Sequence, residues 1–280
     1  MTLLGAAEIR EIAAELDLHP AKSLGQNFVI DGNTCRKIVR LAEVTKSDHV
    51  IEIGPGIGSL TIALLEVAQS LTAIEIDQRL AAKLSSTVAT HLPDSKLEVI
   101  NRDALSLNAL DSSPTVLVAN LPYNISVPVL LHYLEHFPSI KSGVVMVQAE
   151  VADRLAAQPN TREYGIPSVK ASWWAELKLV GSVSRSVFWP VPNVDSKLVR
   201  FVRREVPGDE ALRIETFAAI DSAFAQRRKM LRSALSNWAG SSAEAAGILS
   251  DAAIDPTLRG EALTLRDFCA IGKAKLAKNG

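Results

Sequence analysis

HVIEIGPGIG, residues 49–58, is the stretch that decides the fold. An apolar, β-branched run passes directly into a loop with glycines at 54, 56 and 58, and a helical pattern follows over about 58–68. Glycines let the backbone turn tightly and let a ligand approach without meeting a Cβ atom. The stretch therefore predicts the first strand of an α/β fold and a ligand site at the carboxyl end of that strand.

The alternation of strand and helix continues along the chain. Further strand-like runs lie at 71–76, 97–100, 115–119 and 143–148, with helical patterns at about 78–90, 126–136 and 149–158. Strands that alternate with helices predict an α/β fold with a parallel, doubly wound sheet and helices on both faces. Two later runs, 177–183 and 198–204, have no clear helix between them and predict an antiparallel hairpin at the edge of the sheet.

The N-terminal residues 1–44 are predicted to be two helices and a loop. Apolar residues at offsets of three and four indicate a helix over 5–17. The segment 22–31, KSLGQNFVID, has no clear period and is typical of a loop. Asp31 is a suitable cap for a second helix over about 33–44.

A second domain is predicted after Pro207-Gly208, which interrupts the α/β pattern. The remaining residues show helical patterns to the end of the chain. Two capping boxes predict further helix starts there: Ser241 with Glu244, and Thr264 with Asp267. We therefore predict a ligand-binding domain over 1–206 and a small all-α domain over 207–280.

Composition limits the class of protein. With 280 residues, 48% hydrophobic and 22% charged, the chain is typical of a globular protein rather than a disordered one. Its two cysteines exclude a disulfide scaffold and a cysteine-based zinc site, and we predict no metal. No apolar stretch approaches the ~20 residues needed to cross a membrane. We expect a cytoplasmic protein, and nothing in the sequence requires more than a monomer.

Basic residues are clustered although the whole chain is nearly neutral. Thirty Lys and Arg against 31 Asp and Glu give a net charge of −1, which does not by itself indicate nucleic-acid binding. Residues 185–204 hold Arg185, Lys197, Arg200, Arg203 and Arg204 against Asp195 alone. A second cluster consists of Arg227, Arg228, Lys229 and Arg232. For either cluster alone, a solvated basic face is the default interpretation.

Two carboxylates at the ends of successive strands extend the predicted ligand site. Glu75 follows Gly54 by 21 residues and suits two ribose hydroxyls, and Asp103 is placed to accept from an adenine amino group. The dinucleotide fingerprint would put its third small residue at Ser59, whereas the glycine lies at 58. The spacing favours S-adenosylmethionine, which has no pyrophosphate that requires a helix N-terminus. The alternative is that the glycines only turn a strand into a helix.

The tetrapeptide Asn120-Leu121-Pro122-Tyr123, at the end of the fourth strand, is the most specific signal. Adenine N6 is a poor nucleophile because its lone pair is delocalised, and it improves when both N–H groups donate to fixed acceptors. The Asn120 side-chain oxygen and the Leu121 carbonyl are candidates for these acceptors. Pro122 stiffens the turn, and Tyr123 offers a face for base stacking. The alternative is a proline turn with Tyr123 in the core.

A second rigid aromatic loop, FWPVPNVDS, lies at 188–196. Its two prolines restrict the backbone, and Phe188 is placed to cover the other face of an extruded base. A hydrophobic corner between edge strands explains the same residues equally well, so this loop alone does not decide between the two interpretations.

A series of motifs spans nearly the whole chain: KSLGQNF at 22–28, EIGPGIG at 52–58, EID at 75–77, RDA at 102–104, NLPYNIS at 120–126, AEVADRL at 149–155, REYGIPSV at 162–169, FWPVPNVDS at 188–196, AFAQRRKMLRSAL at 223–235 and IDPTLRGE at 254–261. Together they resemble the bacterial small-subunit rRNA adenine-N6 dimethyltransferases. The resemblance implies a Rossmann-like, class I S-adenosylmethionine-dependent methyltransferase sheet with a small C-terminal all-α domain.

The resemblance also implies an activity and site residues. The enzyme would dimethylate N6 of two adjacent adenosines in the 3′-terminal hairpin of small-subunit rRNA, on a pre-30S particle during ribosome biogenesis. S-adenosylmethionine would be bound by Asn27, Val29, Gly54, Gly56, Glu75, Asp103 and Asn120. Tyr123 and Phe188 would hold the target adenine beside Asn120, Leu121 and Pro122. Arg227, Arg228 and Lys229 would help to seat the RNA, with Lys197 and Arg200 as further candidates.

Three residues depart from the family pattern, and none touches the expected methyl-transfer centre. Val29 stands where Leu is commoner, Ala149 where Lys is frequent, and Ser233 where Asn is usual. Two other functions stay open. One is the related macrolide-resistance group, which methylates large-subunit rRNA, and the other is a non-catalytic RNA-binding or assembly factor on the same fold.

Overall fold

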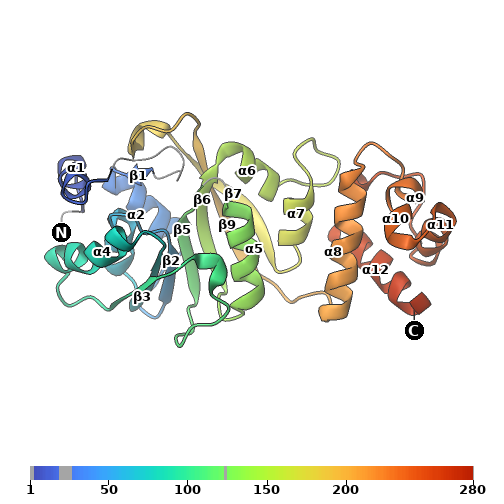
Figure 1. Ribbon diagram of the computed structural model, residues 1–280, viewed down its shortest axis with the longest axis horizontal. Helices are drawn as coiled ribbons and strands as arrows, with labels where there is room; N and C mark the ends of the chain where they lie inside the picture. Colours follow the sequence, from blue (N-terminus) through green and yellow to red (C-terminus); the bar gives the residue numbers. More distant parts are fainter. Residues whose placement is uncertain (1–2, 19–26, 123–124, 280) are drawn as a thin grey trace. The chain divides into compact units, whose positions relative to one another are not determined.

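The computed structural model describes residues 3–18, 27–122 and 125–279 (Figure 1). The chain divides into two compact units, one formed by Met1–Ala152 and Leu177–Arg203, the other by Asp153–Glu176 and Arg204–Gly280. The predicted division at 206/207 lies close to the second boundary. The predicted and observed domains differ in the position of residues 153–176. The prediction placed these residues with the sheet, whereas the structure places them with the C-terminal helices.

The first unit is built on a seven-stranded sheet of order β4-β3-β2-β5-β6-β9-β7. The strands are β2 (His49–Ile53), β3 (Ser70–Glu75), β4 (Leu97–Asn101), β5 (Val116–Asn120), β6 (Ser142–Gln148), β7 (Ala175–Val183) and β9 (Ser196–Arg203). Strands β2 to β6 are parallel, which confirms the predicted doubly wound sheet. Because β3 and β5 lie on opposite sides of β2, a crevice opens at the carboxyl ends of these strands.

The two late strands extend the sheet in a different order from their order in the sequence. β9 pairs antiparallel with β6, from Ser142 opposite Val202 to Gln148 opposite Ser196, and β7 lies beyond it at the edge. The segment between them contains a 3-10 turn, η3 (Arg185–Val187), and a two-residue strand, β8 (Phe188–Trp189). The predicted edge strands are therefore present, but the connection between them is long and structured.

Helices cover both faces of the sheet. On one face α1 (Ala6–Glu15), α2 (Gly32–Leu41), α3 (Ser59–Leu65) and α4 (Gln78–His91) share a core with strand residues such as Val50 and Val118. The intervening strand residues, such as Ile51 and Leu117, are equally buried but lie outside that core, because successive side chains point to opposite faces. That second face is covered by α5 (Ser126–His136) (Figure 1), and α6 (Ala149–Leu155) follows β6 in the chain.

Part of the predicted loop over 22–31 is a strand. Phe28–Val29 form β1, which pairs antiparallel with β8, and the Ile30 N–H donates to the Val187 carbonyl at 2.8 Å. The loop prediction for 22–26 lies outside the described residues. The prediction for Asp31 is confirmed, since its carboxylate accepts from the Thr34 N–H at 2.9 Å and opens α2.

The second unit is helical. Its elements are α7 (Ile166–Ala171), α8 (Glu210–Ala225), α9 (Leu231–Ala234), α10 (Ser236–Ala239), α11 (Ser242–Asp251), a 3-10 turn η4 (Gly260–Ala262) and α12 (Leu265–Asn279). The Glu244 N–H donates to Ser241 Oγ, and the Thr264 N–H donates to Asp267 Oδ2, so both predicted helix starts are confirmed.

Specific contacts place residues 153–176 in this second unit. The buried Tyr164 hydroxyl donates to the Leu263 carbonyl at 2.7 Å. The rings of Trp173 and Trp174 both meet Phe217 of α8 edge to face, with centroids 5.9 and 5.4 Å away. Among the described residues, no helix of either unit is long and apolar enough to span a membrane.

Candidate active site

A cavity of about 500 Å³ lies at the carboxyl ends of β2, β3 and β5 in the first unit. Every residue predicted to bind the cofactor lines it: Asn27, Val29, Gly54, Gly56, Glu75, Asp103 and Asn120. Leu121 and Pro122 line it as well, and Tyr123 lies outside the described residues. The structure thus brings together segments that the sequence places far apart, at the edge where a doubly wound sheet binds its ligands.

Gly56 closes the loop over the cavity in a conformation that suits glycine. Its φ is +58°, and a Cβ atom at this position would lie 2.9 Å from the Phe28 ring. Its N–H points at the next strand and donates to Glu75 Oε2 at 3.1 Å. The glycine therefore serves both the packing of β1 against the loop and the placement of the carboxylate.

Glu75 is a buried carboxylate held by backbone donors. Only 5% of the residue is exposed, and Oε1 accepts from the Asp77 N–H at 3.0 Å while Oε2 accepts from Gly56. Burial raises the pKa of the Glu75 carboxyl, and the two N–H donors oppose that rise. Each oxygen has more than one lone-pair direction, so the carboxylate can also accept from ligand hydroxyls.

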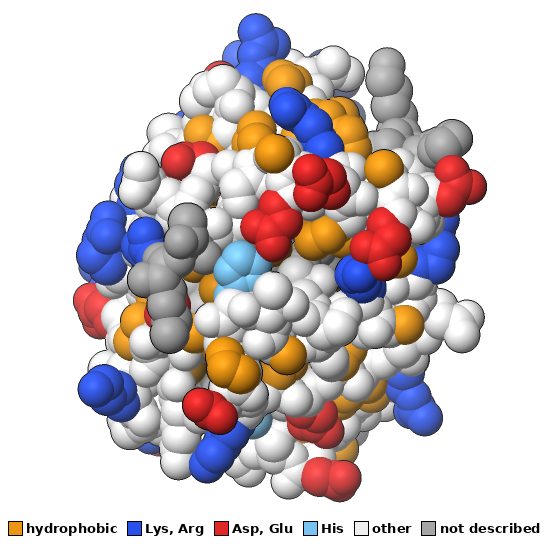
Figure 2. Space-filling model, turned by 90° about the vertical axis from the view of Figure 1, so that its left-hand side faces the viewer, with side chains coloured by type: hydrophobic (Ala, Val, Ile, Leu, Met, Phe, Trp, Pro, Cys, Tyr) orange, Lys and Arg blue, Asp and Glu red, His pale blue; other side chains and the backbone are white. Residues whose placement is uncertain are grey.

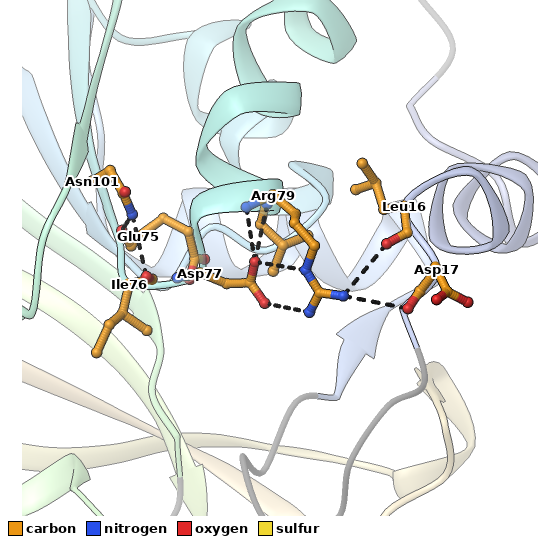
Figure 3. Close-up of polar contacts among 8 residues, drawn as sticks. Leu16, Asp17, Glu75, Ile76, Asp77, Arg79 and Asn101 are labelled. Carbon is orange, nitrogen blue, oxygen red and sulfur yellow. Dashed lines mark hydrogen bonds and ion pairs between the residues drawn. The ribbon is translucent and has the colours of Figure 1, made fainter.

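Figure 3 shows how the strand end that carries Glu75 is fixed. Asn101 of β4 donates through Nδ2 to the Glu75 carbonyl at 2.8 Å. Asp77 caps α4, and Arg79 binds its carboxylate at 2.8 Å (Figure 3). The other arm of Arg79 reaches the carbonyls that follow α1, with Nη1 3.3 Å from the Asp17 oxygen (Figure 3). The end of β3 that carries the Glu75 carboxylate is thereby linked to the N-terminal segment.

The predicted adenine-binding end of the cavity is more open. Asp103 is exposed and lies at the start of a 3-10 turn, η2 (Ala104–Ser106), where Oδ1 accepts from the Leu105 N–H at 2.9 Å. Ile76 also lines the cavity although the residue is 68% exposed. An exposed apolar side chain beside a hydrogen-bond acceptor suits a flat, polar-edged ring.

Asn120 lies at the end of β5 with its amide oriented. Nδ2 donates to the Asn27 carbonyl at 3.0 Å, which determines which end of the amide carries the oxygen. The next residue, Leu121, is anchored because its N–H donates to the Met146 carbonyl of β6 at 3.0 Å. The Ile125 N–H donates to the Pro122 carbonyl at 3.2 Å and closes the turn. The predicted acceptors are thus presented from a fixed backbone.

Sequence reasoning missed Glu52, which lines the same cavity from near the carboxyl end of β2. It is 1% exposed, and Oε2 has no hydrogen-bond partner among the described residues. Burial, assisted by the nearby charge of Glu75, raises the pKa of Glu52 to about 8. The signal was present in the sequence, since an acid within a buried, apolar parallel strand needs a specific reason.

Phe188 is not at the cavity. It is 1% exposed, belongs to the core of the first unit and lies opposite Val29 in the β1–β8 pair. Its ring is therefore not among the side chains that line the cavity, and its contact with a base stays a prediction. Its neighbour Trp189 stacks on Phe28, with ring centroids 6.3 Å apart.

The predicted RNA-binding residues lie in both units, and they differ in exposure and in ion pairing. In β9, Lys197 and Arg200 are half-buried, and Arg200 pairs with Glu43. In the second unit, Arg227 pairs with Glu261 at 2.8 Å, whereas Arg228 and Lys229 are exposed. The face of the first unit seen in Figure 2 bears basic and acidic side chains interspersed over its described residues, in agreement with the near-neutral net charge.

The part of the chain that the structure describes was also searched for clusters of metal-binding side chains. Within the described ranges, no group of three or more His, Cys, Asp or Glu side chains is arranged to hold a metal ion. The two cysteines, Cys35 and Cys269, are free and buried.

A doubly wound sheet with this strand order, a glycine loop after β2 and a cavity beside it define the fold of the class I S-adenosylmethionine-dependent methyltransferases. Within that class the chain belongs to the ribosomal RNA adenine dimethylase family, whose model matches residues 19–271.

Relatives of known name are similar over almost their whole length. A ribosomal RNA small subunit methyltransferase A from Streptomyces coelicolor is 55% identical over 98% of this chain and 97% of its own. One of the same name from Thermobifida fusca is 54% identical over 97% and 96%.

Two solved structures have a similar fold. A dimethyladenosine transferase from Plasmodium falciparum has a TM-score of 0.72 and 25% identity, covering 86% of this chain and 94% of that one. The 23S rRNA methyltransferase ErmE has a TM-score of 0.66 and 26% identity, covering 89% and 99%.

Proposed function

We propose that the protein transfers methyl groups from S-adenosylmethionine to N6 of two adjacent adenosines in the 3′-terminal hairpin of small-subunit rRNA. The observation that carries the proposal is that Glu75, Asp103 and Asn120 line one cavity together. Relatives about 55% identical over nearly the full chain carry a small-subunit name, which supports the choice of RNA. We place the activity in the cytoplasm, on a pre-30S particle, with the protein acting as a monomer.

The residues of the cavity fit S-adenosylmethionine. Its ribose diol would find the Glu75 carboxylate, its adenine would find Asp103 and Ile76, and the glycine loop would border the aminoacyl group. Glu52 lines this cavity, and its buried Oε2, which has no hydrogen-bond partner among the described residues, is proposed as an acceptor for an ammonium group. When bound, the cosubstrate supplies a methyl group on a cationic sulfur, which needs no metal or general base for its activation.

The contribution of the chain is alignment of the target amine. The Asn120 side-chain oxygen and the Leu121 carbonyl accept the two hydrogens of adenine N6, which turns the nitrogen lone pair out of conjugation with the ring. Both acceptors are pre-positioned, the first by Asn27 and the second by the anchored strand end. Such fixed dipoles stabilise a developing charge without reorganising during the reaction.

Base and RNA binding are assigned to residues outside this pair. Tyr123 is proposed to stack on the extruded adenine. Phe188 is proposed to cover its other face, which requires the loop at 188–196 to shift because the ring is buried. Arg228 and Lys229 are proposed as the principal phosphate contacts of the cluster, since their side chains are exposed and the Arg227 guanidinium is held by Glu261.

The test is methylation of isolated subunits. Undermethylated small subunits and, separately, large subunits are incubated with the protein and labelled S-adenosylmethionine, and the rRNA is digested to nucleosides. We expect N6,N6-dimethyladenosine from the small subunit alone. Label confined to the large subunit would instead favour the second candidate, an activity like that of ErmE, for which the structural similarity speaks. An absence of label from both would leave a non-catalytic RNA-binding factor.

A further inference from the structure

A second cavity, of about 660 Å³, is lined entirely by residues of the helical unit. Its walls are the loop at 157–159, part of α7, the chain at 204–207 and the first turns of α12. Neither the methyl-transfer centre nor the cluster Arg227–Lys229 contributes a lining residue. This cavity is therefore a feature that the proposed chemistry does not use.

The charged residues at this cavity are mostly basic. Arg204, Arg266 and Lys273 contribute three positive charges and Glu205 one negative charge, which leaves a surplus of two. Among the described residues, neither Arg266 nor Lys273 has an ion-pair or hydrogen-bond partner, and both are exposed. Further along the same helix Lys278 is different, since it pairs with Asp251 at 2.9 Å.

The spacing of the basic residues on α12 places them on the same face of the helix. Arg266, Cys269, Ala270 and Lys273 are separated by three, one and three positions, so they share one face of the helix, and all four line the cavity. Arg204 lines the cavity from another segment of the chain, where its guanidinium donates to the Ser172 carbonyl and its N–H donates to the Trp174 carbonyl at 2.9 Å. Burial raises the pKa of the Cys269 thiol, and the charges of Lys273 and Arg204 oppose that rise, which agrees with the position of all three residues at this cavity.

The start of α12 adds to the positive potential. Thr264, Leu265 and Arg266 line the cavity, and a helix of fifteen residues begins there. The amino end of a helix carries a partial positive charge and favours anions. The acid on this turn, Asp267, is engaged in the capping box with Thr264 and does not line the cavity.

The cavity adjoins the predicted RNA-binding cluster through a shared loop. The loop that lines the cavity at 157–159 continues to Asn160, whose N–H donates to the Glu261 carbonyl at 2.8 Å. The carboxylate of Glu261 holds Arg227 at 2.8 Å, and Arg227 also donates to the Thr161 carbonyl at 3.2 Å. Exposed, unpaired cations beside such a cluster suit a polyanion that passes over the surface better than an enclosed small ligand.

We propose that this cavity binds a backbone phosphate of the rRNA substrate, with Arg266 and Lys273 as its contacts and Arg204 completing the site. The inference rests on the proposed function and names a second point, beside Arg228 and Lys229, at which the helical unit holds the RNA. The occupant is a phosphodiester within the polynucleotide rather than free inorganic phosphate.

The test measures the affinity of variant proteins for small subunits at several salt concentrations. The variants are Arg266→Ala and Lys273→Ala, with Lys278→Ala as the matched control on the same helix. Each phosphate contact contributes about one to the slope of log K against log salt. We expect Arg266→Ala and Lys273→Ala to bind several-fold more weakly with a smaller slope, and Arg266→Lys to restore most of the affinity. Glu205→Gln should bind more tightly, and Lys278→Ala should match the wild type.

Two outcomes would overturn the inference. One is an affinity and salt slope that are the same in all variants while the wild type still methylates small subunits. The other concerns inorganic phosphate, whose binding is measured by calorimetry. If the wild type binds it tightly and the alanine variants lose that binding without any change in RNA binding, the cavity is a site for free phosphate. Failure of the proposed function would look different, because the wild type itself would then not methylate the subunits. Urea unfolding with the same transitions in all variants verifies that the helical unit of each remains folded.

Discussion

The side-chain amide of Asn120 donates to the backbone carbonyl of Asn27 at 3.0 Å, across 93 positions of sequence. This bond joins the end of β5 to the residue that precedes β1, and both residues line the same cavity. The amide therefore links the segment proposed to contact the cosubstrate with the residue proposed to accept from the target amine. The two ends of the amide therefore have separable roles, since the nitrogen holds the N-terminal segment and the oxygen is the acceptor that we propose for the target amine.

Replacement of Asn120 should separate methyl transfer from cosubstrate binding. We expect Asn120→Ala to lower kcat for small-subunit methylation by about 100-fold or more, because loss of one pre-positioned hydrogen-bonding group has effects of about that size. Cosubstrate affinity should fall much less. Methyl incorporation and calorimetry measure the two quantities, and the exposed Asn108→Ala serves as control. Unchanged methyl transfer in Asn120→Ala would show that the residue has no part in the reaction.

Glu75→Gln should weaken S-adenosylmethionine binding by about tenfold or more. The substitution keeps the shape, but an amide nitrogen cannot accept from the Gly56 or Asp77 N–H, so a buried donor loses its partner. Calorimetric titration measures the dissociation constant. The matched control is Glu98→Gln, which removes the same charge from an exposed position on β4. Equal affinities for the two variants would contradict the role of Glu75 as a ligand-binding carboxylate.

Gly56→Ala should disturb the loop even though it adds only a methyl group. The residue has a positive φ, and the new Cβ would lie 2.9 Å from the Phe28 ring, so the ring or the loop must move. We expect about 1–3 kcal/mol of destabilisation and a large loss of cosubstrate affinity. Urea unfolding and calorimetry provide the two readouts. Gly5→Ala, where an added Cβ meets nothing within 4 Å, should leave both unchanged.

The sheet and the cavity were accessible from the sequence because their signals are local. Each parallel strand is a β-branched run, and the residues that end successive strands must meet at one edge whatever the loops do. That is why Glu75, Asp103 and Asn120 could be expected together from one sequence. The acid within β2, Glu52, carried the same kind of local signal and could have been added.

Features that depend on residues far apart in the chain could not be predicted from the sequence. The pair β1–β8 has two residues a side, too few for a period, and its partners are about 160 positions apart. The segment 153–176 follows a sheet strand in sequence, but Tyr164 finds its partner 99 positions later. Arg200 and Arg227 looked like free cations because Glu43 and Glu261 are remote in sequence. Burial and pairing of this kind are tertiary properties.

Glu52 predicts a specific dependence of stability on pH. Its pKa in the folded protein is about 8, against 4.5 for an unburied carboxyl. Between these values the folded state keeps a proton that the unfolded state loses, so stability falls as pH rises from about 4.5 to about 8 and stays low above that. A pKa difference of this size corresponds to about 5 kcal/mol as an upper bound.

The variant Glu52→Gln cannot titrate, so its stability should lack this decline. We expect wild type and variant to be similar near pH 5, and the variant to be more stable by a few kcal/mol near pH 9, as measured by urea unfolding across the range. Titrating groups that do not interact with Glu52 are common to both proteins and cancel in the comparison, whereas Glu75 and Cys35 interact with its charge. Parallel stability profiles would mean that Glu52 is already ionised in the folded protein. The carboxylate would then have a compensating partner in the folded protein, and the raised pKa assigned to it would have to be abandoned.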